Sequence, residues 1–280
     1  MPSGRHGEVF DAVAEAYDRV RPSYPTTLVD AACTIGGLSE GSPVLEVGCG
    51  TGKLTEALVE RRLAVDAVDP GPNMIAFAAR RTGDAVRFHV GRFEELELPS
   101  ASFDAVFSAT AFHWIDPAVG WTNAHRLLRP GGTLALLMFI TYLDEETGAN
   151  DEAVHQVFER HMPVHDDWID RPLRDLATLH AGVQERCDDI SAVWTWLGHH
   201  DVTGPGVPSL FEDVTLTTAL ERREQTADQL WAFFETTSGY PRIDTATRDA
   251  LRNDLDDTFD RLGGTLRSNE LCVLVTSRAV

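Results

Sequence analysis

The sequence predicts an α/β fold in which a mostly parallel sheet carries helices on both faces. Short apolar segments alternate with segments of helical periodicity from Val44 onwards. The first apolar segment, Val44–Val47, runs directly into a turn, Gly48–Gly52, in which every second residue is glycine. The second apolar segment ends at an acid, Asp69. Strand, glycine turn, helix, strand and acid in this order are typical of a nucleotide-binding βαβ unit.

The glycine turn differs from the fingerprint of dinucleotide-binding proteins. The third glycine of that fingerprint would fall at Lys53, whereas the run Glu46–Gly52 has the closer spacing Gly-x-Gly-x-Gly. This run, with its leading acid, resembles motif I of the class I S-adenosylmethionine-dependent methyltransferases. Asp69 lies 21 residues after Gly48 (69 − 48), at the distance where an acid holds a ribose hydroxyl. A glycine-rich surface turn followed by an unrelated aspartate is the alternative interpretation.

The resemblance covers residues 9–139 and implies a Rossmann-like sheet. The implied strand order is 3-2-1-4-5-7-6, with seven strands, strand seven antiparallel, and helices on both faces. The run Leu128–Gly132, with the pattern Leu-x-Pro-Gly-Gly, is a further feature of the class. The residue pattern itself predicts strands at 63–69, 86–90, 103–108 and 133–139, and helices at 53–60, 74–81 and 118–128.

The resemblance also implies a cofactor, S-adenosyl-L-methionine, with S-adenosyl-L-homocysteine as its product. The glycine turn would surround the methionine part, Asp69 the ribose, and the residues after strand three the adenine. Many relatives have an aspartate where Arg92 stands, which leaves the adenine contact to backbone or to Phe93. The cofactor-binding residues expected are Tyr17, Arg21, Glu46, Gly48, Cys49, Gly50, Asp69, Pro70, Met74, Arg92, Phe93, Glu94, Ala109 and Thr110.

A candidate catalytic segment, Ala109–Asp116, follows the fourth strand, at the edge where doubly wound sheets place their chemistry. It resembles the His-Trp form of methyltransferase motif IV. The imidazole of His113 has an ordinary pKa near 6.5, which suits a general base for a hydroxyl or carbon acid. A structural ring that braces the loop beside Trp114 is the alternative. The acceptor pocket is expected to contain Tyr24, Phe112, Trp114 and Tyr240.

The N-terminal segment predicts a helix over Val9–Val20, which ends before the prolines of Arg21–Pro25. A second helix is predicted at 28–35. The run Ala-x-x-Tyr-Asp-x-x-Arg-Pro-x-Tyr-Pro resembles the entry segment of the trans-aconitate methyltransferase-like group, which commonly folds over the cofactor. Tyr17, Arg21 and Tyr24 are therefore lid candidates, and packing of the helix onto the sheet is the alternative.

The remaining chain is expected to complete one domain. Residues 1–42 would form the helical lid, 43–140 the cofactor-binding core, 141–208 an inserted helical cap, and 209–280 the last strands and helices. Helices are predicted near 151–162, 171–181, 185–198, 226–236 and 245–262, and strands at 211–220 and 270–277.

Composition narrows the function classes. A formal net charge of −20 repels phosphate backbones, which argues against nucleic acid as a partner. No apolar run approaches the ~20 residues that span a membrane, and the N-terminus lacks a signal peptide's apolar stretch, so we expect a cytoplasmic protein.

The four cysteines form no Cys-x-x-Cys pair. His161, His165, Asp166 and Asp167 are ligand types, but Pro163 disrupts helical spacing, and no metal site is expected.

The sequence thus predicts a methyltransferase that uses S-adenosylmethionine and acts on a small-molecule acceptor, by O- or C-methylation. Two alternatives remain open. The first is an enzyme of the same fold that uses the cofactor for another reaction, such as a cyclisation. The second is a non-catalytic partner protein that only binds S-adenosylmethionine. The identity of the acceptor and the oligomeric state are not determined by the sequence.

Overall fold

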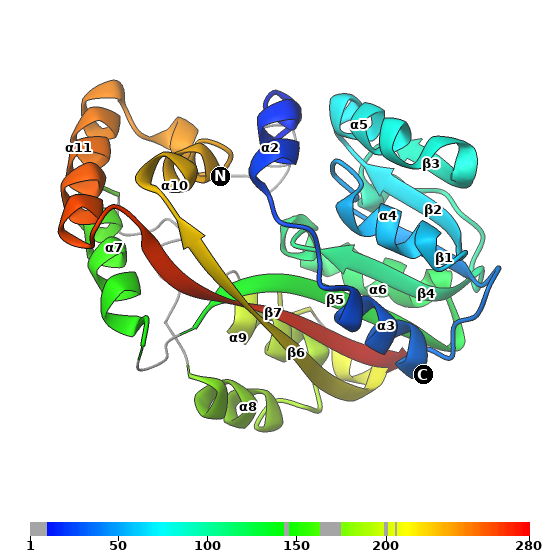
Figure 1. The fold of residues 1–280 in the computed structure, drawn as a ribbon. Coiled ribbons are helices and arrows are strands. Elements are labelled where there is room, and N and C mark those ends of the chain that lie inside the picture. Colours follow the sequence, from blue (N-terminus) through cyan, green and yellow to red (C-terminus); the bar gives the residue numbers. More distant parts are fainter. Residues whose placement is uncertain (1–9, 143–145, 163–174, 199–200, 205) are drawn as a thin grey trace.

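The computed structural model describes residues 10–142, 146–162, 175–198, 201–204 and 206–280. Its strands form one sheet in the order β3-β2-β1-β4-β5-β7-β6 (Figure 1). Strands β1 to β5 pair in parallel, and β7 is antiparallel to both β5 and β6. The predicted order and the antiparallel seventh strand are therefore confirmed. The strands are β1 Pro43–Val47, β2 Ala64–Asp69, β3 Val86–Val90, β4 Phe103–Ala109, β5 Leu128–Thr141, β6 Phe211–Gln225 and β7 Leu266–Ala279.

Helices cover both faces of this sheet because its strands bury side chains on both sides. In β1, Val44 packs into the cluster under α3, α4 and α5, whereas Leu45 and Val47 pack into the opposite cluster. That opposite cluster lies under α6, α8 and α9. These helices are α3 Thr26–Ile35, α4 Lys53–Glu60, α5 Pro72–Thr82, α6 Pro117–Leu127, α8 Leu176–Gln184 and α9 Ile190–Gly198. Short 3-10 helices are η1 Gly83–Ala85, η2 Phe93–Glu95, η3 Phe112–Trp114, η4 Val207–Ser209 and η5 Tyr240–Arg242.

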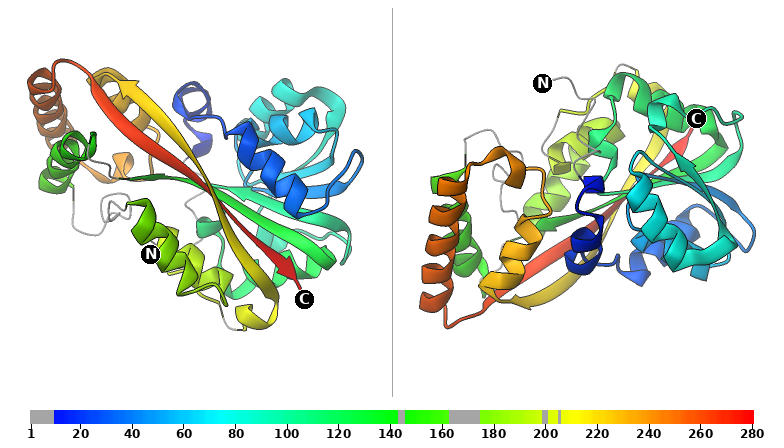
Figure 2. Two further views of the ribbon diagram at one scale, coloured as in Figure 1. Left: turned by 60° about the horizontal axis from the view of Figure 1, so that its bottom comes forward. Right: turned by 90° about the horizontal axis from the view of Figure 1, so that it is seen from above.

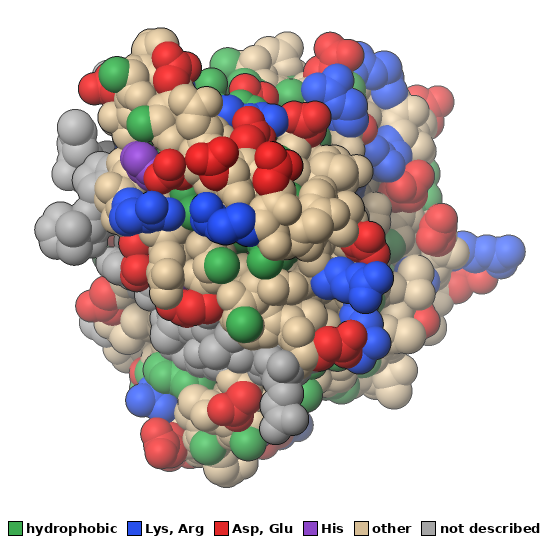
Figure 3. All heavy atoms as spheres, turned by 60° about the vertical axis from the view of Figure 1, so that its left-hand side comes forward, with side chains coloured by type: hydrophobic (Ala, Val, Ile, Leu, Met, Phe, Trp, Pro, Cys, Tyr) green, Lys and Arg blue, Asp and Glu red, His purple; other side chains and the backbone are tan. Residues whose placement is uncertain are grey.

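A third apolar cluster lies beyond the end of the sheet. It joins α7 (Gly148–His161), α10 (Ala227–Phe234) and α11 (Thr245–Arg261) through buried side chains such as Phe158 and Phe234, whose ring centroids are 5.2 Å apart. Two further views show this group of helices at the far end of the long β6–β7 pair (Figure 2). On the face that carries it, acidic side chains are spread with basic ones between them (Figure 3). No described helix has the length and hydropathy to cross a membrane.

The segment expected to form one cap contributes to two different layers. Helix α7 packs against α11, whereas α8 and α9 lie against the sheet. Helix α9 buries Val193, Trp194 and Leu197 completely, which explains why it covers strands rather than a solvent-facing pocket. It begins at Ile190 because Asp189 accepts hydrogen bonds from the first amides of the helix, at Ser191 N (2.8 Å).

Helix α2 (Ala14–Val20) lies between the two halves of the molecule, with α5 on one side and α10 on the other (Figure 1). The chain then runs across the carboxyl edge of the sheet to α3. Strands β1, β2, β4 and β5 all end at this edge, and the antiparallel β7 begins there. Ligands of doubly wound sheets bind outside the carboxyl ends of the strands. The fold therefore places α2 over the edge at which a binding site is expected.

Candidate active site

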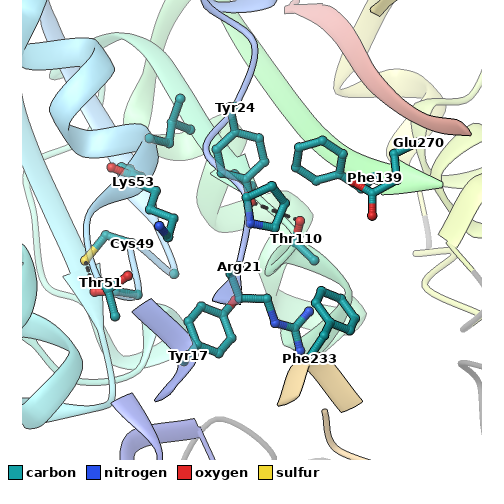
Figure 4. A pocket seen from close by; sticks show the side chains of 16 residues that line it. Tyr17, Arg21, Tyr24, Cys49, Thr51, Lys53, Thr110, Phe139, Phe233 and Glu270 are labelled. Atoms are coloured by element: carbon teal, nitrogen blue, oxygen red, sulfur yellow. Dashed lines mark hydrogen bonds between the residues drawn. The ribbon is translucent and has the colours of Figure 1, made fainter. Parts of the chain in front are cut away.

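A cavity opens at this edge of the sheet, between the glycine turn after β1 and helix α10 (Figure 4). We call it the edge cavity. It contains about 750 Å³ of empty space, including solvent at its mouth. Its walls come from both ends of the sequence. The lining residues are Tyr17, Arg21, Pro22, Tyr24, Glu46, Gly48, Cys49, Gly50, Thr51, Lys53, Leu54, Ala109, Thr110, Phe139, Phe233 and Glu270.

The glycine turn forms one wall and leaves its backbone exposed to a ligand. Gly48, Gly50 and Gly52 all have positive φ angles, of 72°, 53° and 85°, which side-chain-bearing residues rarely adopt. A Cβ at Gly48 would lie only 2.3 Å from the Cβ of Ala111, in the loop after β4. Glycine is therefore required here for two reasons: the backbone conformation and the close approach of the two loops.

Asp69, the acid at the end of β2, is held against this turn. Gly50 N donates to its Oδ2 (2.9 Å) and Gly71 N donates to its Oδ1 (2.8 Å). Burial raises the pKa of Asp69, and the two amide hydrogen bonds oppose that rise. Each carboxylate oxygen keeps a second lone pair that could accept from a hydroxyl. Asp69 thus has the chemistry of a ribose-binding acid, although its side chain is not among those that line the edge cavity.

Glu46 lies beneath the turn and is 1% exposed. Burial raises its pKa to about 8, and the negative charge of Asp69 adds to the rise while a contact with Thr55 opposes it. Its Oε2 atom is buried without a hydrogen-bond partner within the described chain. A buried polar atom of this kind next to a glycine cradle fits a ligand that carries a donor, such as the ammonium of an amino acid.

The opposite wall is built around Thr110, the residue after β4. Its φ is 53°, an uncommon value for a β-branched residue, and strain of this kind clusters at functional sites. The hydroxyl groups of Tyr24 and Thr110 share a hydrogen bond of 3.0 Å. The Tyr24 ring stacks on Phe139, with ring centroids 5.4 Å apart. Burial raises the pKa of Tyr24, so this side chain stays a neutral phenol.

Arg21 connects the segment after α2 to the C-terminal helices. Its guanidinium donates to Thr236 Oγ1 (3.1 Å) and to the carbonyl of Thr236 (2.9 Å). The same group lies 4.8 Å from the ring centre of Tyr17 and 4.2 Å from that of Phe233, so it is stacked between two aromatic rings. Burial lowers its pKa, but a guanidinium remains charged at any physiological pH.

A second contact fixes the residues just before α2. Asp11 Oδ1 accepts from Asn73 N (2.7 Å) and Met74 N (3.2 Å), the first amides of α5. Residues 11–24 therefore cross the whole edge, from α5 through the glycine turn to α10. In this structure the segment covers the edge cavity and also packs against both halves, so the lid and packing interpretations are both compatible with its position.

The residues expected around adenine lie outside the edge cavity, beyond the ends of β2 and β3. Met74 and Phe93 are buried, at 2% and 4% exposure. Arg92 forms an ion pair of 2.9 Å with Glu94, whose Oε1 also accepts from Asp116 N (3.2 Å). Pro70 is partly exposed next to Asp69. Of the expected cofactor residues, those in the edge cavity are Tyr17, Arg21, Glu46, Gly48, Cys49, Gly50, Ala109 and Thr110.

Of the residues expected in the acceptor pocket, Tyr24 lines the edge cavity and the other three do not. Phe112 is buried against Trp121, with ring centroids 4.6 Å apart. Tyr240 packs on Phe234 (5.6 Å) in the cluster between α10 and α11. Trp114 packs on Phe10 (6.0 Å) and lies next to His113.

His113 lies on η3, and its ring centroid is 4.8 Å from that of Trp114. The side chain is partly exposed and does not line the edge cavity. The structure thus places this histidine in the predicted loop but not at the wall of the candidate site.

Seven residues that line the edge cavity were not among those expected from the sequence: Pro22, Thr51, Lys53, Leu54, Phe139, Phe233 and Glu270. The signal for Lys53 was present, because it directly follows the glycine turn. Phe139 and Glu270 lie where β5 ends and β7 begins, so the predicted topology could have placed both at this edge. Phe233 comes from α10, and no pattern in the sequence connects that helix to motif I.

A second cavity of about 980 Å³, solvent at its mouth included, adjoins the first and shares Phe139, Phe233 and Glu270 with it. It lies between the strand ends and helices α7 and α10. Across β6 and β7, Arg223 Nε lies 2.7 Å from Glu270 Oε2. Burial raises the pKa of Glu270, and the charge of Arg223 opposes that rise. The two cavities together provide more room for a ligand than the edge cavity alone.

Within the described ranges, no group of three or more His, Cys, Asp or Glu side chains could hold a metal ion. His161, one of the candidates weighed from the sequence, lies 2.7 Å from Asp254. The other candidates, His165, Asp166 and Asp167, fall outside the described residues.

Residues 45–136, about a third of the chain (92 of 280), match the profile of the family described as methyltransferase domain. An uncharacterized methyltransferase of Mycobacterium tuberculosis is 43% identical over 128 residues, which cover 46% of this chain and 51% of the relative. A malonyl-[acyl-carrier protein] O-methyltransferase of Hahella chejuensis is 37% identical over 143 residues, which cover 48% of this chain and 49% of the relative. The chain therefore spans about half the length of the curated relatives it matches.

Among solved structures, a candidate type II methyltransferase from Anaeromyxobacter dehalogenans is similar over 92% of this chain and 97% of its own, with a TM-score of 0.57 and 23% identity. At this identity the likeness concerns the fold alone. The strand order and the matched profile agree with one another. Residues 45–136 therefore resemble a methyltransferase domain, and the sheet that contains them has the strand order expected for the fold of the class I S-adenosylmethionine-dependent methyltransferases.

Proposed function

We propose that this protein transfers the methyl group of S-adenosylmethionine to a small-molecule acceptor. One observation carries the proposal: the edge cavity is walled by a glycine turn that is hydrogen-bonded to Asp69, with Ala109 and Thr110 on the far side. The relatives that share the domain support it, since they are named as methyltransferases. The malonyl-[acyl-carrier protein] enzyme supports a non-nucleic-acid acceptor, as does the net charge of −20.

The proposed binding mode distributes the cofactor over the predicted residues. Its amino-acid part would lie against the glycine turn and Glu46, under Tyr17 and Arg21. Its ribose would bond to Asp69, beside Pro70. Its adenine would lie near Met74, Arg92, Phe93 and Glu94, and its sulfonium near Ala109 and Thr110.

The cofactor supplies a methyl carbon that the sulfonium already activates. The chain then has to orient the acceptor in line with the carbon–sulfur bond and keep water out. Tyr24, stacked on Phe139 and bonded to Thr110, provides a rigid wall for this orientation. The segment 11–24 excludes water by covering the cavity, and we propose that it opens to admit ligands.

The role of His113 depends on the acceptor. A hydroxyl or carbon acid requires a base, whereas a carboxylate is already nucleophilic. Because its ring packs beside Trp114 and outside the edge cavity, we propose that His113 supports the loop rather than taking a proton.

Calorimetric titration with S-adenosylhomocysteine tests the proposal. The wild-type protein should bind it, and Asp69→Ala should weaken binding by about 1–3 kcal/mol, the cost of hydroxyls left unpaired. Asp84→Ala, at a carboxylate on η1 away from the edge cavity, is the matched control and should bind normally. Incubation with S-adenosylmethionine and sets of carboxylates, phenols and amines then identifies the acceptor class by formation of S-adenosylhomocysteine. Absence of binding of both cofactor forms would refute the proposed function.

A further inference from the structure

Lys53 is the single lysine of the chain, in which the other 23 basic residues counted with it are arginine. It is the first residue of α4 and directly follows the glycine turn. Its side chain is 14% exposed and lines the edge cavity. In Figure 4 it lies on the side of the glycine turn, away from Phe233 and Glu270. This ammonium is therefore placed next to the expected site of the cofactor's amino-acid part.

The positive charge of Lys53 has only one weak ion-pair partner among the described residues. The ammonium makes no hydrogen bond within the part of the chain that the structure describes, and its nearest carboxylate oxygen is Asp18 Oδ1, at 3.9 Å. That oxygen is already bonded to Arg81, at 2.7 Å. Burial lowers the pKa of Lys53, the charge of Asp18 opposes this, and Arg81 lowers the pKa further. A partly desolvated ammonium with three unused donors favours a carboxylate ligand.

Arg21, the other described cation that lines the edge cavity, already has partners in the protein. Its guanidinium donates two hydrogen bonds to Thr236 and is stacked between two aromatic rings. A protein with a net charge of −20 repels anions at long range, so an anionic group needs a local cation to be held. Of the two cations among the described residues that line the cavity, Lys53 is the one whose donors make no hydrogen bond there, and it lies beside the turn.

We propose that Lys53 binds the α-carboxylate of the cofactor's amino-acid part. This inference rests on the proposed function and adds a residue to it. Lys53 would then bind the carboxylate of the cofactor, and Glu46, below the turn, would face the ammonium of the cofactor. The contact of Lys53 with Asp18 offers a different explanation, in which Lys53 only fastens α2, and the experiment has to separate the two.

Two ligands distinguish a contact between Lys53 and the carboxylate from a purely structural role of Lys53. S-adenosylhomocysteine carries the amino-acid group, whereas 5′-methylthioadenosine has the same adenosine and sulfur without it. Lys53→Met should raise the Kd for S-adenosylhomocysteine at least about 10-fold and leave that for 5′-methylthioadenosine within about two-fold. Arg81→Gln is the matched control because Arg81 also bonds Asp18 but does not line the cavity. It should leave the ratio of the two dissociation constants unchanged.

A change of less than two-fold for S-adenosylhomocysteine in Lys53→Met, an equal loss for both ligands, or the same loss ratio in Arg81→Gln overturns the inference. A wild-type protein that binds no S-adenosylhomocysteine refutes the proposed function itself. The two failures are therefore distinguishable.

Chemical labelling of the wild-type protein gives a readout that does not depend on the folding of a variant. Trinitrobenzenesulfonate reacts with amines, and Lys53 carries the single ε-amine of the chain. S-adenosylhomocysteine should slow its labelling several-fold, while 5′-methylthioadenosine should not, and the α-amine of the chain is the internal reference. Equal protection by both ligands, or none by bound S-adenosylhomocysteine, contradicts a contact with the carboxylate.

Discussion

Replacing the buried carboxyl of Glu46 by an amide, in Glu46→Gln, should make the stability of the protein less dependent on pH. Glu46 is 1% exposed, and its pKa is raised from 4.5 to about 8, chiefly by burial. The folded chain thus holds the proton more tightly than the unfolded chain does. A raised carboxyl pKa lowers the free energy of unfolding progressively as the pH rises from about 4.5 to about 8.

The size of this effect follows from the two pKa values. Their difference of 3.5 (8 − 4.5) corresponds to about 5 kcal/mol as an upper limit, because one pKa unit is about 1.4 kcal/mol. Most of this loss of unfolding free energy, about 3 kcal/mol, occurs between pH 5 and pH 8. The glutamine cannot ionise, so its free energy of unfolding lacks this loss. An unpaired buried amide costs about 1–3 kcal/mol, but that cost is the same at every pH.

Urea denaturation of both proteins from pH 5 to pH 9, without ligand, measures the effect. The unfolding free energy of Glu46→Gln minus that of the wild type should rise by about 3 kcal/mol between pH 5 and pH 8. Other groups titrate in both proteins and largely cancel in this difference. Glu60→Gln, at an exposed glutamate of α4, is the control and should give a flat difference. A flat difference for Glu46→Gln as well would refute the assignment of a raised pKa to this carboxyl.

Three further outcomes are expected. Gly48→Ala should lose about 2–4 kcal/mol of stability in urea denaturation, because its Cβ meets Ala111 at 2.3 Å and its φ is positive; an unchanged midpoint would contradict both. His113→Ala should lower kcat less than 10-fold on an acceptor found by screening, and a loss of 100-fold or more would identify His113 as the base after all. Hydrogen exchange of residues 10–25 should slow when S-adenosylhomocysteine binds, whereas equal exchange with and without ligand would argue that this segment only packs.

The first half of the fold was predictable because its signals are local. The glycine turn, the acid 21 residues later and the alternation of Val86–Val90 each lie within one element, and β3 has the predicted bounds. The last two strands extend further than predicted. The run Glu221–Gln225 is mostly charged and lacks alternating apolar residues, so the predicted strand ends at 220, yet the run continues the ladder with the start of β7. Ion pairs across that ladder, such as Arg267 with Glu224 (3.3 Å), replace the apolar pattern that sequence reasoning relies on.

The candidate site divides along the same line. The wall made by Glu46–Lys53 is contiguous in sequence, and motif I predicts most of it. The other wall requires contacts between distant residues, such as Arg21 with Thr236 and Tyr24 with Thr110, which are 215 and 86 positions apart. Sequence periodicity does not predict contacts between such distant residues, so the position of Phe233 in the cavity wall could not be predicted.

The wall that the sequence did not predict is also the one expected to determine which acceptor binds. The matched family profile ends at residue 136, before Phe139, Phe233 and Glu270. These three side chains separate the edge cavity from its neighbour, and an acceptor that extends beyond the first cavity has to pass them. Residues that bind a shared cofactor can stay the same while the acceptor changes, because methyl transfer depends mainly on how the acceptor is oriented. The choice of acceptor should therefore follow substitutions at this boundary, outside the matched profile, rather than substitutions in the glycine turn.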